Sequence, residues 1–568
     1  MKKLTKQILS LTLAVLMVMG LLAGCGGNNN PGGNNAGDDE TITLTVFSEL
    51  ANYSGEQVGW IADILLEKFN VVLNIIPAAD GVYETRMESG FLGDIVIWGG
   101  DGENYTRAIE AGLLYDWNED NLVQEYGPYI YENMQPALEK NARLTETVNK
   151  QHTVYGFGHN VAGSTGDHES FFYTWDIRWD LYQQLGYPEV NNMDDLLAVL
   201  KGMKEICPTD DNGNETYAVS LWPDWDGDMV MYVKAFATAY YGYDEHGIGL
   251  YDPKTGTYHG ALEQGGPYLE ALRFFNQLNQ NDLLDPNSMT QTYENMYEKV
   301  QAGGVFFSIF NYSGSLGYNS EAHTAANKMM CSLVPNEGSP IVYAMSDEGA
   351  NRIWSIGSNT EYPEKCMEII NWLCTPEGVM TYFYGPEDLC WYYDEEGYTH
   401  WTDFGKEVYF KRDTLMTGDY EGTGDFNSGC LQVNNTTWSI DAINPDSNGE
   451  RFNYLYWKSY QADASCPVEQ DWRDHFGVSS VEEYMETTDY TVCKNFTFAS
   501  KSDEFKTTWS AVTDIIVTYS WRAIYASSDA EFNYIVSQMV SQANAYGYEE
   551  CLEWAVNQAQ ERYALEIS

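Results

Sequence analysis

Three apolar stretches near the N-terminal end, residues 41–47, 70–77 and 94–99, have the period and composition of β-strands. Ser54 is placed as an N-cap before apolar residues at helical spacing, and the polar segment 84–89 predicts a second helix. This order limits the possible folds strongly, because successive parallel strands need a helical crossover between them. The sequence therefore predicts an α/β fold with mainly parallel strands covered by helices.

Strands and helices continue to alternate further along the chain. Asn192 is placed to cap a helix whose apolar face carries Leu196, Leu200, Met203 and Ile206, with Asp195 as its capping partner. Other predicted elements are a strand over 217–222 that Pro223 ends, a hairpin over 251–260, a helix over 265–286, strands over 303–311 and 352–357, a helix opened by Pro363 and helical periodicity from Ala530 to Ala564. The chain is less periodic after residue 395.

The first residues predict export and anchoring. Lys2, Lys3 and Lys6 precede an apolar run too short to span a bilayer comfortably, and "LLAGC" follows, ending at Cys25. This start resembles a bacterial lipoprotein signal, which implies that residues 1–24 are removed and that Cys25 is lipidated, carrying a palmitate-type acyl chain. The polar residues up to 40 form a flexible tether. We therefore expect a protein on the extracellular face of the cell membrane.

The charge of the chain limits its partners. The formal net charge is −54 at pH 7, and removing residues 1–24 takes away three lysines and no acid, which gives −57. A surface this acidic repels phosphate backbones, so nucleic acid is excluded as a partner. Polyanionic ligands are also disfavoured unless a local basic patch compensates.

Ten cysteines less Cys25 leave nine, so a complete set of disulfides is impossible. Cys366 and Cys374 fall on one predicted helix about 12 Å apart, beyond disulfide reach. We expect most of these cysteines to be small buried apolar residues, and no CxxC pair suggests a metal site.

The stretch "SLWPDWDGD" over 220–228 joins two tryptophans and three aspartates. A calcium loop needs glycine at its sixth position and an acid at its twelfth; counted from Asp224, glycine falls fourth and Ala235 is twelfth, and "DDNGN" from Asp210 fails similarly. No metal or other cofactor is expected. An acid pair for glycoside cleavage is possible, but acids are abundant in this chain. Motifs for a nucleophile, a zinc protease or a P-loop are absent from the sequence.

A sugar-binding platform fits this stretch best, because a sugar needs a flat aromatic ring beneath it and polar groups at its rim. If the segment is extended, Trp222, Asp224 and Asp226 share one face. The predicted ligand-binding residues here are Trp222, Asp224, Trp225 and Asp226. Further candidates stand at predicted strand ends: Glu49, Asn52, Tyr53, Trp98, Trp175, Asn311, Tyr312 and Trp354. Each of them could instead pack at the edge of its sheet, and His159 is a further residue of interest.

Several stretches in order resemble the extracellular solute-binding proteins of bacterial ABC sugar importers, in their large oligosaccharide-binding group. They are "LLAGC", "LGDIVIWGG", "WDLYQQLGYPEVNNMDDLLAVLKGM", "YLEALRFFNQLNQNDLLDP", "VFFSIFN" and "WSIGSNTEYPEKCMEIINWLCTPEGVMTYFYG". The resemblance implies a type II periplasmic-binding-protein fold of two lobes, each a mainly parallel sheet flanked by helices, with the ligand cleft between them. We assign residues 41–155 and 346–395 to the first lobe, and residues 156–345 and 396–568 to the second.

The resemblance also implies a monomeric binding protein, not an enzyme, that delivers an oligosaccharide to the permease subunits of an ABC transporter. A peptide-binding protein of similar architecture and a surface glycoside hydrolase or lyase remain alternatives, and a non-transporting adhesin is a third.

Overall fold

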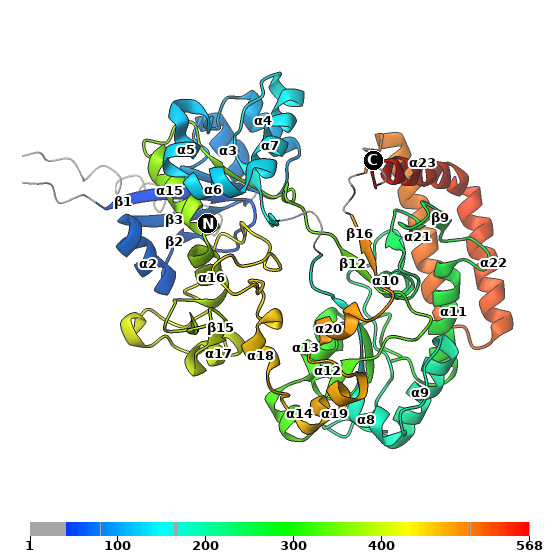
Figure 1. The fold of residues 1–568 in the computed structure, drawn as a ribbon. Coiled ribbons are helices and arrows are strands. Elements are labelled where there is room, and N and C mark those ends of the chain that lie inside the picture. The colour runs from blue at the N-terminus through cyan, green and yellow to red at the C-terminus, as the bar shows by residue number, and fades with distance from the viewer. Residues whose placement is uncertain are drawn as a thin grey trace, which may run out of the picture. The chain divides into compact units, whose positions relative to one another are not determined.

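The computed structural model describes residues 41–79, 81–163, 168–494, 496, 498–499 and 501–566 (Figure 1). Cys25, the predicted signal and the tether lie outside the described residues. None of the described helices is both long and apolar enough to cross a membrane.

The first sheet has six strands in the order β2-β3-β1-β4-β13-β5. Their bounds are β1 (Ile42–Ser48), β2 (Gly55–Glu56), β3 (Val71–Pro77), β4 (Ile95–Trp98), β5 (Phe157–Gly158) and β13 (Ile353–Ile356). β1 and β4 are parallel, as predicted, with Val46 opposite Ile95. β13 is antiparallel to β4 and to β5, and β2 is antiparallel to β3. The sheet is therefore mixed, because β13 and the short edge strand β2 each run antiparallel to their neighbours.

The described chain segments that contain the strands of this sheet also form eight helices. They are α2 (Trp60–Phe69), α3 (Val82–Ser89), α4 (Glu103–Glu110), α5 (Leu122–Tyr126), α6 (Pro128–Asn133), α7 (Gln135–Asn149), α15 (Pro363–Cys374) and α16 (Pro376–Tyr384). Pro363 opens α15 as predicted. Ser54 does not cap α2; the N-cap is Gly59, with φ of 81°. A side chain at Gly59 would approach the backbone of Gly429 to 2.3 Å, so this helix start depends on a contact with a distant segment.

The second sheet consists of β6 (Tyr173–Arg178), β10 (Phe307–Phe310) and β11 (Met330–Ser332) in the order β10-β6-β11. β10 and β11 both run antiparallel to β6, which corrects the prediction of a mainly parallel sheet. Residues 217–222 form no regular strand, but Tyr217 and Val219 make isolated parallel bridges to Val305 and Leu284. The chain is thus an α/β protein with several sheets of mixed direction.

Eight further helices of the described residues come after β6 begins. They are α8 (Trp179–Gln184), α9 (Met193–Ile206), α10 (Met231–Tyr241), α11 (Pro267–Gln280), α12 (Tyr293–Gln301), α21 (Asp503–Ile524), α22 (Asp529–Ala545) and α23 (Tyr548–Glu566). Asn192 caps α9 by accepting from the backbone of Asp194 and Asp195, as predicted, although Ile206 is exposed. The periodicity from 530 corresponds to α22 and α23, whereas α21 was not predicted. α21 packs against α22 (Figure 1).

The remaining elements are short. They are β7 (Asp244–Glu245), β8 (Gly249–Tyr251), β9 (Tyr258–Gly260), β12 (Ile341–Tyr343), β14 (Trp391–Tyr393), β15 (Thr399–Trp401), β16 (Thr491–Cys493), α13 (Ser315–Tyr318), α14 (Glu321–Ala325), α17 (Asp403–Phe410), α18 (Lys458–Gln461), α19 (Pro467–Phe476), α20 (Val481–Glu486) and 3₁₀ turns at Glu119–Asn121, Gly418–Tyr420 and Tyr454–Tyr456. β8 and β9 form the hairpin expected over 251–260.

The segment after residue 395 contacts elements of the first sheet, although the sequence assigned it to the second lobe. The Trp60 indole of α2 donates to the Phe426 carbonyl at 3.0 Å, and the Trp438 indole donates to the Cys374 carbonyl of α15 at 2.7 Å. These contacts place residues 426–438 with the first sheet. The lobe boundary at 395 stays a prediction, and these two hydrogen bonds show that part of the segment after it joins helices of the first sheet.

The nine described cysteines form no disulfide, and seven of them are buried. This agrees with their predicted role as small apolar residues.

Glu482 of α20 makes stability depend on pH. Its side chain is buried, and burial raises its pKa from 4.5 to about 7. The folded state therefore holds a proton that the unfolded chain releases, so this contribution is present below about pH 4.5 and is lost as the pH rises through about 7. We expect Glu482→Gln to raise the melting temperature more at about pH 8 than at about pH 5. Melts followed by circular dichroism measure this, and an equal shift at both values would contradict it.

Candidate functional site

The loop 222–228 is a turn and not an extended segment. The backbone N–H of Asp226 donates to the Pro223 carbonyl at 3.0 Å. Trp222 is therefore buried at 1% exposure while Trp225 is 48% exposed, and Asp224 points to solvent. Trp222, Asp224 and Asp226 were expected to share one face if the segment were extended, and the turn means that this condition is not met.

Trp225 is the outer member of a group of aromatic rings. It stacks on Tyr293 with ring centres 4.6 Å apart and an interplanar angle of 26°. Tyr293 in turn stacks on Tyr297 at 5.6 Å, and Tyr312 lies tilted against Trp225 at 6.1 Å and against Tyr293 at 6.3 Å. We call Trp225, Tyr293, Tyr297 and Tyr312 the aromatic column. Because Trp225 is 48% exposed, about half of this side chain is open to solvent at the end of the column.

The fold explains why these rings meet. Tyr217 bridges Val305 in parallel, so the chain segments leading to Trp222 and to β10 end at the same edge. Tyr312 follows β10, and its neighbour Asn311 is held there by donating its backbone N–H to the Phe172 carbonyl at 2.9 Å. The predicted convergence of strand ends is thus met for the loop 222–228 and residues 311–312.

Helix α12 supplies the two column residues that were not predicted. Thr292 and Asn295 form a capping box that fixes the start of the helix at Tyr293. Tyr297 lies one turn later, so both rings project from the same helix face. The i, i+4 spacing of the two tyrosines in "TYENMYEKV" is the signal that could have identified them.

Each aspartate of the loop accepts a hydrogen bond that fixes local structure. Asp224 accepts from the Tyr293 backbone N–H at 2.9 Å. Asp226 accepts from the Met231 backbone N–H at 2.8 Å and from the Trp521 indole at 2.6 Å, and Asp228 accepts from the Trp509 indole at 2.8 Å. Burial raises the pKa of Asp226. These roles join the loop to α10, α12 and α21.

Asp226→Asn is expected to destabilise the fold by about 1–3 kcal/mol, because one of two oxygens that accept becomes an NH₂ group facing a donor. Asp228→Asn is the matched control, since the hydrogen bond of Asp228 to Trp509 uses a single oxygen and an amide oxygen can replace it. Urea denaturation of both variants measures the difference. Equal losses of stability in the two variants would contradict this role for Asp226.

Three other predicted tryptophans are core residues. Trp98 and Trp175 are fully buried and Trp354 is 2% exposed. Their indole N–H groups donate to the Ser355 hydroxyl at 3.2 Å, the Ala239 carbonyl at 3.2 Å and the Thr436 carbonyl at 2.6 Å, respectively. Burial and these hydrogen bonds account for the three rings as packing residues in this structure, and their role in ligand binding stays a prediction.

Glu49, Asn52 and Tyr53 are a second set of predicted ligand-binding residues, and they follow β1 as predicted. Glu49 accepts from the Gly99 backbone at 2.8 Å and from the Asn104 side chain at 2.7 Å. Tyr53 donates to the Glu56 carbonyl at 2.5 Å, and Asn52 is exposed. Among these three, Asn52 keeps the most open side chain.

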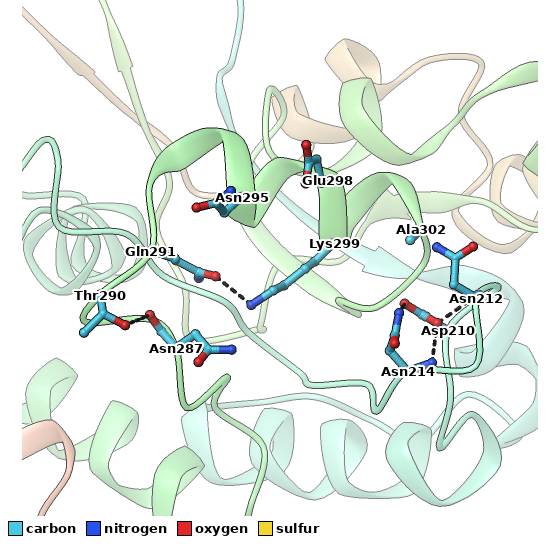
Figure 2. A pocket seen from close by; sticks show the side chains of 10 residues that line it. All are labelled: Asp210, Asn212, Asn214, Asn287, Thr290, Gln291, Asn295, Glu298, Lys299 and Ala302. Carbon is cyan, nitrogen blue, oxygen red and sulfur yellow. Dashed lines mark hydrogen bonds between the residues drawn. The ribbon is translucent and has the colours of Figure 1, made fainter.

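A polar hollow of about 520 Å³ lies next to α12 and is lined in part by Asp210, Asn212 and Asn214 of the "DDNGN" loop (Figure 2). The Asp210 carboxylate is engaged within its own loop, where it accepts from the backbone N–H groups of Asn212 at 2.9 Å and Asn214 at 2.7 Å. Lys299 donates to Gln291 at 2.6 Å and to Asp285 at 2.5 Å. Within the described residues, no group of three His, Cys, Asp or Glu side chains could hold a metal ion.

No protein-family model matches the sequence. No curated protein matches it either. Among solved structures, an extracellular solute-binding protein from Bifidobacterium longum subsp. infantis has a TM-score of 0.57 at 12% identity, covering 94% of this chain and 100% of its own. A calcium-free alginate-binding protein has a TM-score of 0.52 at 15% identity, covering 92% and 98%. A Streptococcus pneumoniae ABC-transporter substrate-binding protein in complex with kestose has a TM-score of 0.51 at 13% identity, covering 92% and 99%. Over nearly its whole length, the chain therefore has the fold of the extracellular solute-binding proteins of ABC sugar transporters.

Proposed function

We propose that this protein is the solute-binding component of an ABC importer and captures an extracellular oligosaccharide without covalent chemistry. The observation that carries this function is the half-exposed Trp225 ring at the end of the aromatic column, since an aromatic face is what the apolar face of a sugar requires. The fold supports it, because structures of similar fold include proteins named for binding alginate and kestose.

In this proposal the protein has two lobes, the first formed by residues 41–155 and 346–395 with the segment 426–438 that bonds to α2 and α15, and the second by residues 156–345 and the rest of the chain after 395. Closure of the lobes removes the sugar from water and presents a shape that the permease recognises. Cys25 carries the lipid that holds the protein on the outer face of the membrane.

A thermal-shift screen of the purified protein tests this function, because a ligand that binds only the folded state raises the melting temperature. The panel contains neutral oligosaccharides of plant, host and microbial origin, acidic oligosaccharides and short peptides. A carbohydrate that raises the melting temperature and is recovered intact supports capture. Recovery of cleaved sugar would identify a glycoside hydrolase or lyase, and shifts with peptides alone would identify a peptide-binding protein.

A further inference from the structure

The two chain segments that build the aromatic column are rich in carboxylates. The segments that build it, residues 217–241 and 283–319, are described in full and carry six acids, Asp224, Asp226, Asp228, Asp285, Glu294 and Glu298. Asp224 is exposed next to Trp225 in the loop and accepts from the Tyr293 backbone N–H at 2.9 Å, and Glu294 is a further exposed acid in the first turn of α12. Hydrogen bonds with its own backbone and with Thr292 lower the pKa of Glu294, so it is ionised at neutral pH.

The same two segments carry only two cations, and both are already used. Lys234 is nearly buried and forms an ion pair with Glu245. Lys299 forms an ion pair with Asp285 at 2.5 Å and donates to Gln291 at 2.6 Å. No arginine occurs in either segment. The local basic patch that an anionic ligand would need is therefore missing from the segments that build the column.

We infer that the column selects uncharged oligosaccharides and rejects uronate-containing ones. A carboxylate on a sugar ring stacked on Trp225 would lie near Asp224, and the two segments supply no unpaired cation for it, whereas a neutral hydroxyl group can donate to the Asp224 carboxylate. Hydrogen bonds from a neutral donor to a charged acceptor are stronger than those between neutral groups. The arrangement thus favours neutral sugars in two ways. This inference rests on the proposed function and names the ligand class of the same site.

The experiment compares matched ligands by isothermal titration calorimetry on the purified protein. Malto-, cello-, manno-, xylo- and fructo-oligosaccharides are the neutral probes, and oligogalacturonates and alginate oligomers of the same lengths are the anionic ones. We expect at least one neutral series to bind about tenfold or more tightly than either uronate series. Raising the salt concentration to about 0.5 M should tighten any uronate binding severalfold and leave neutral binding nearly unchanged, because salt screens the repulsion.

A charge variant tests the cause of the selectivity. Asp224→Asn removes the exposed charge next to Trp225, keeps an oxygen that can accept from the Tyr293 N–H and should raise uronate affinity relative to neutral affinity severalfold, whereas Glu553→Gln, which removes an exposed charge of α23 outside the column, should not alter that ratio. Uronates that bind as tightly as neutral sugars to the unchanged protein would overturn the inference and leave the proposed function standing. A protein that binds no carbohydrate of either class would overturn the proposed function and the inference with it.

Discussion

Trp225→Ala is expected to weaken oligosaccharide binding by about 30-fold, which corresponds to about 2 kcal/mol. Trp225 offers the open ring face of the column, and alanine removes the surface on which a sugar stacks. Because the ring is half exposed, the free energy of unfolding should change by about 1 kcal/mol or less. Calorimetric titration with the ligand found in the screen measures the affinity, and urea denaturation measures the stability.

Tyr534→Ala is the matched control for this experiment, since Tyr534 is an aromatic residue of α22 with 62% exposure that lies outside the column. It should bind the ligand as the unchanged protein does. Trp225→Phe should retain part of the affinity, because a smaller ring face remains. Unchanged affinity in Trp225→Ala would remove the column from the binding site and with it the observation on which the proposed function rests.

Trp175→Ala is expected to lower the free energy of unfolding by about 3–5 kcal/mol. Trp175 is fully buried and packs against Phe236 at 5.2 Å, Phe307 at 5.7 Å and Tyr240 at 6.2 Å between ring centres. Alanine would leave a cavity in this core and an unpaired Ala239 carbonyl where the indole donated. Urea denaturation followed by circular dichroism measures the loss.

Comparison of the two tryptophan variants separates a core residue from a ligand-binding one. Trp175→Ala should cost much stability, and ligand affinity should be retained at temperatures where the protein is folded; Trp225→Ala should show the reverse. A Trp175→Ala protein of unchanged stability with lost ligand binding would contradict the packing role and restore Trp175 as a candidate contact.

The elements with strong local signals were predicted well. β1, β3 and β4 follow from alternating or continuous apolar residues, and the cap at Asn192 and the start of α15 at Pro363 follow from side-chain chemistry within a few residues. The antiparallel direction of β13 was not predicted, because its apolar content is the same in either direction and only its pairing with β4 decides it. The N-cap of α2 was missed since it depends on the approach of Gly429.

The candidate site shows the same division. Trp225, Asp224 and Tyr312 could be selected from aromatic and acidic side chains after predicted strands. Trp98, Trp175 and Trp354 satisfied the same criterion and are buried, because sequence does not show which side of a strand end faces the core.

The sequence by itself determined the α/β class, the elements with strong local signals such as β1, β3, β4, α9 and α15, and the acidic character of the chain, since these depend on composition and on periodicity over a few residues. The tertiary structure alone decided that Trp225 is open while Trp222 is buried, that Tyr293 stacks beneath Trp225, and that Lys234 and Lys299 are already paired. The physical reason is that burial, stacking and charge pairing are set by contacts between segments far apart along the chain, which no local pattern records.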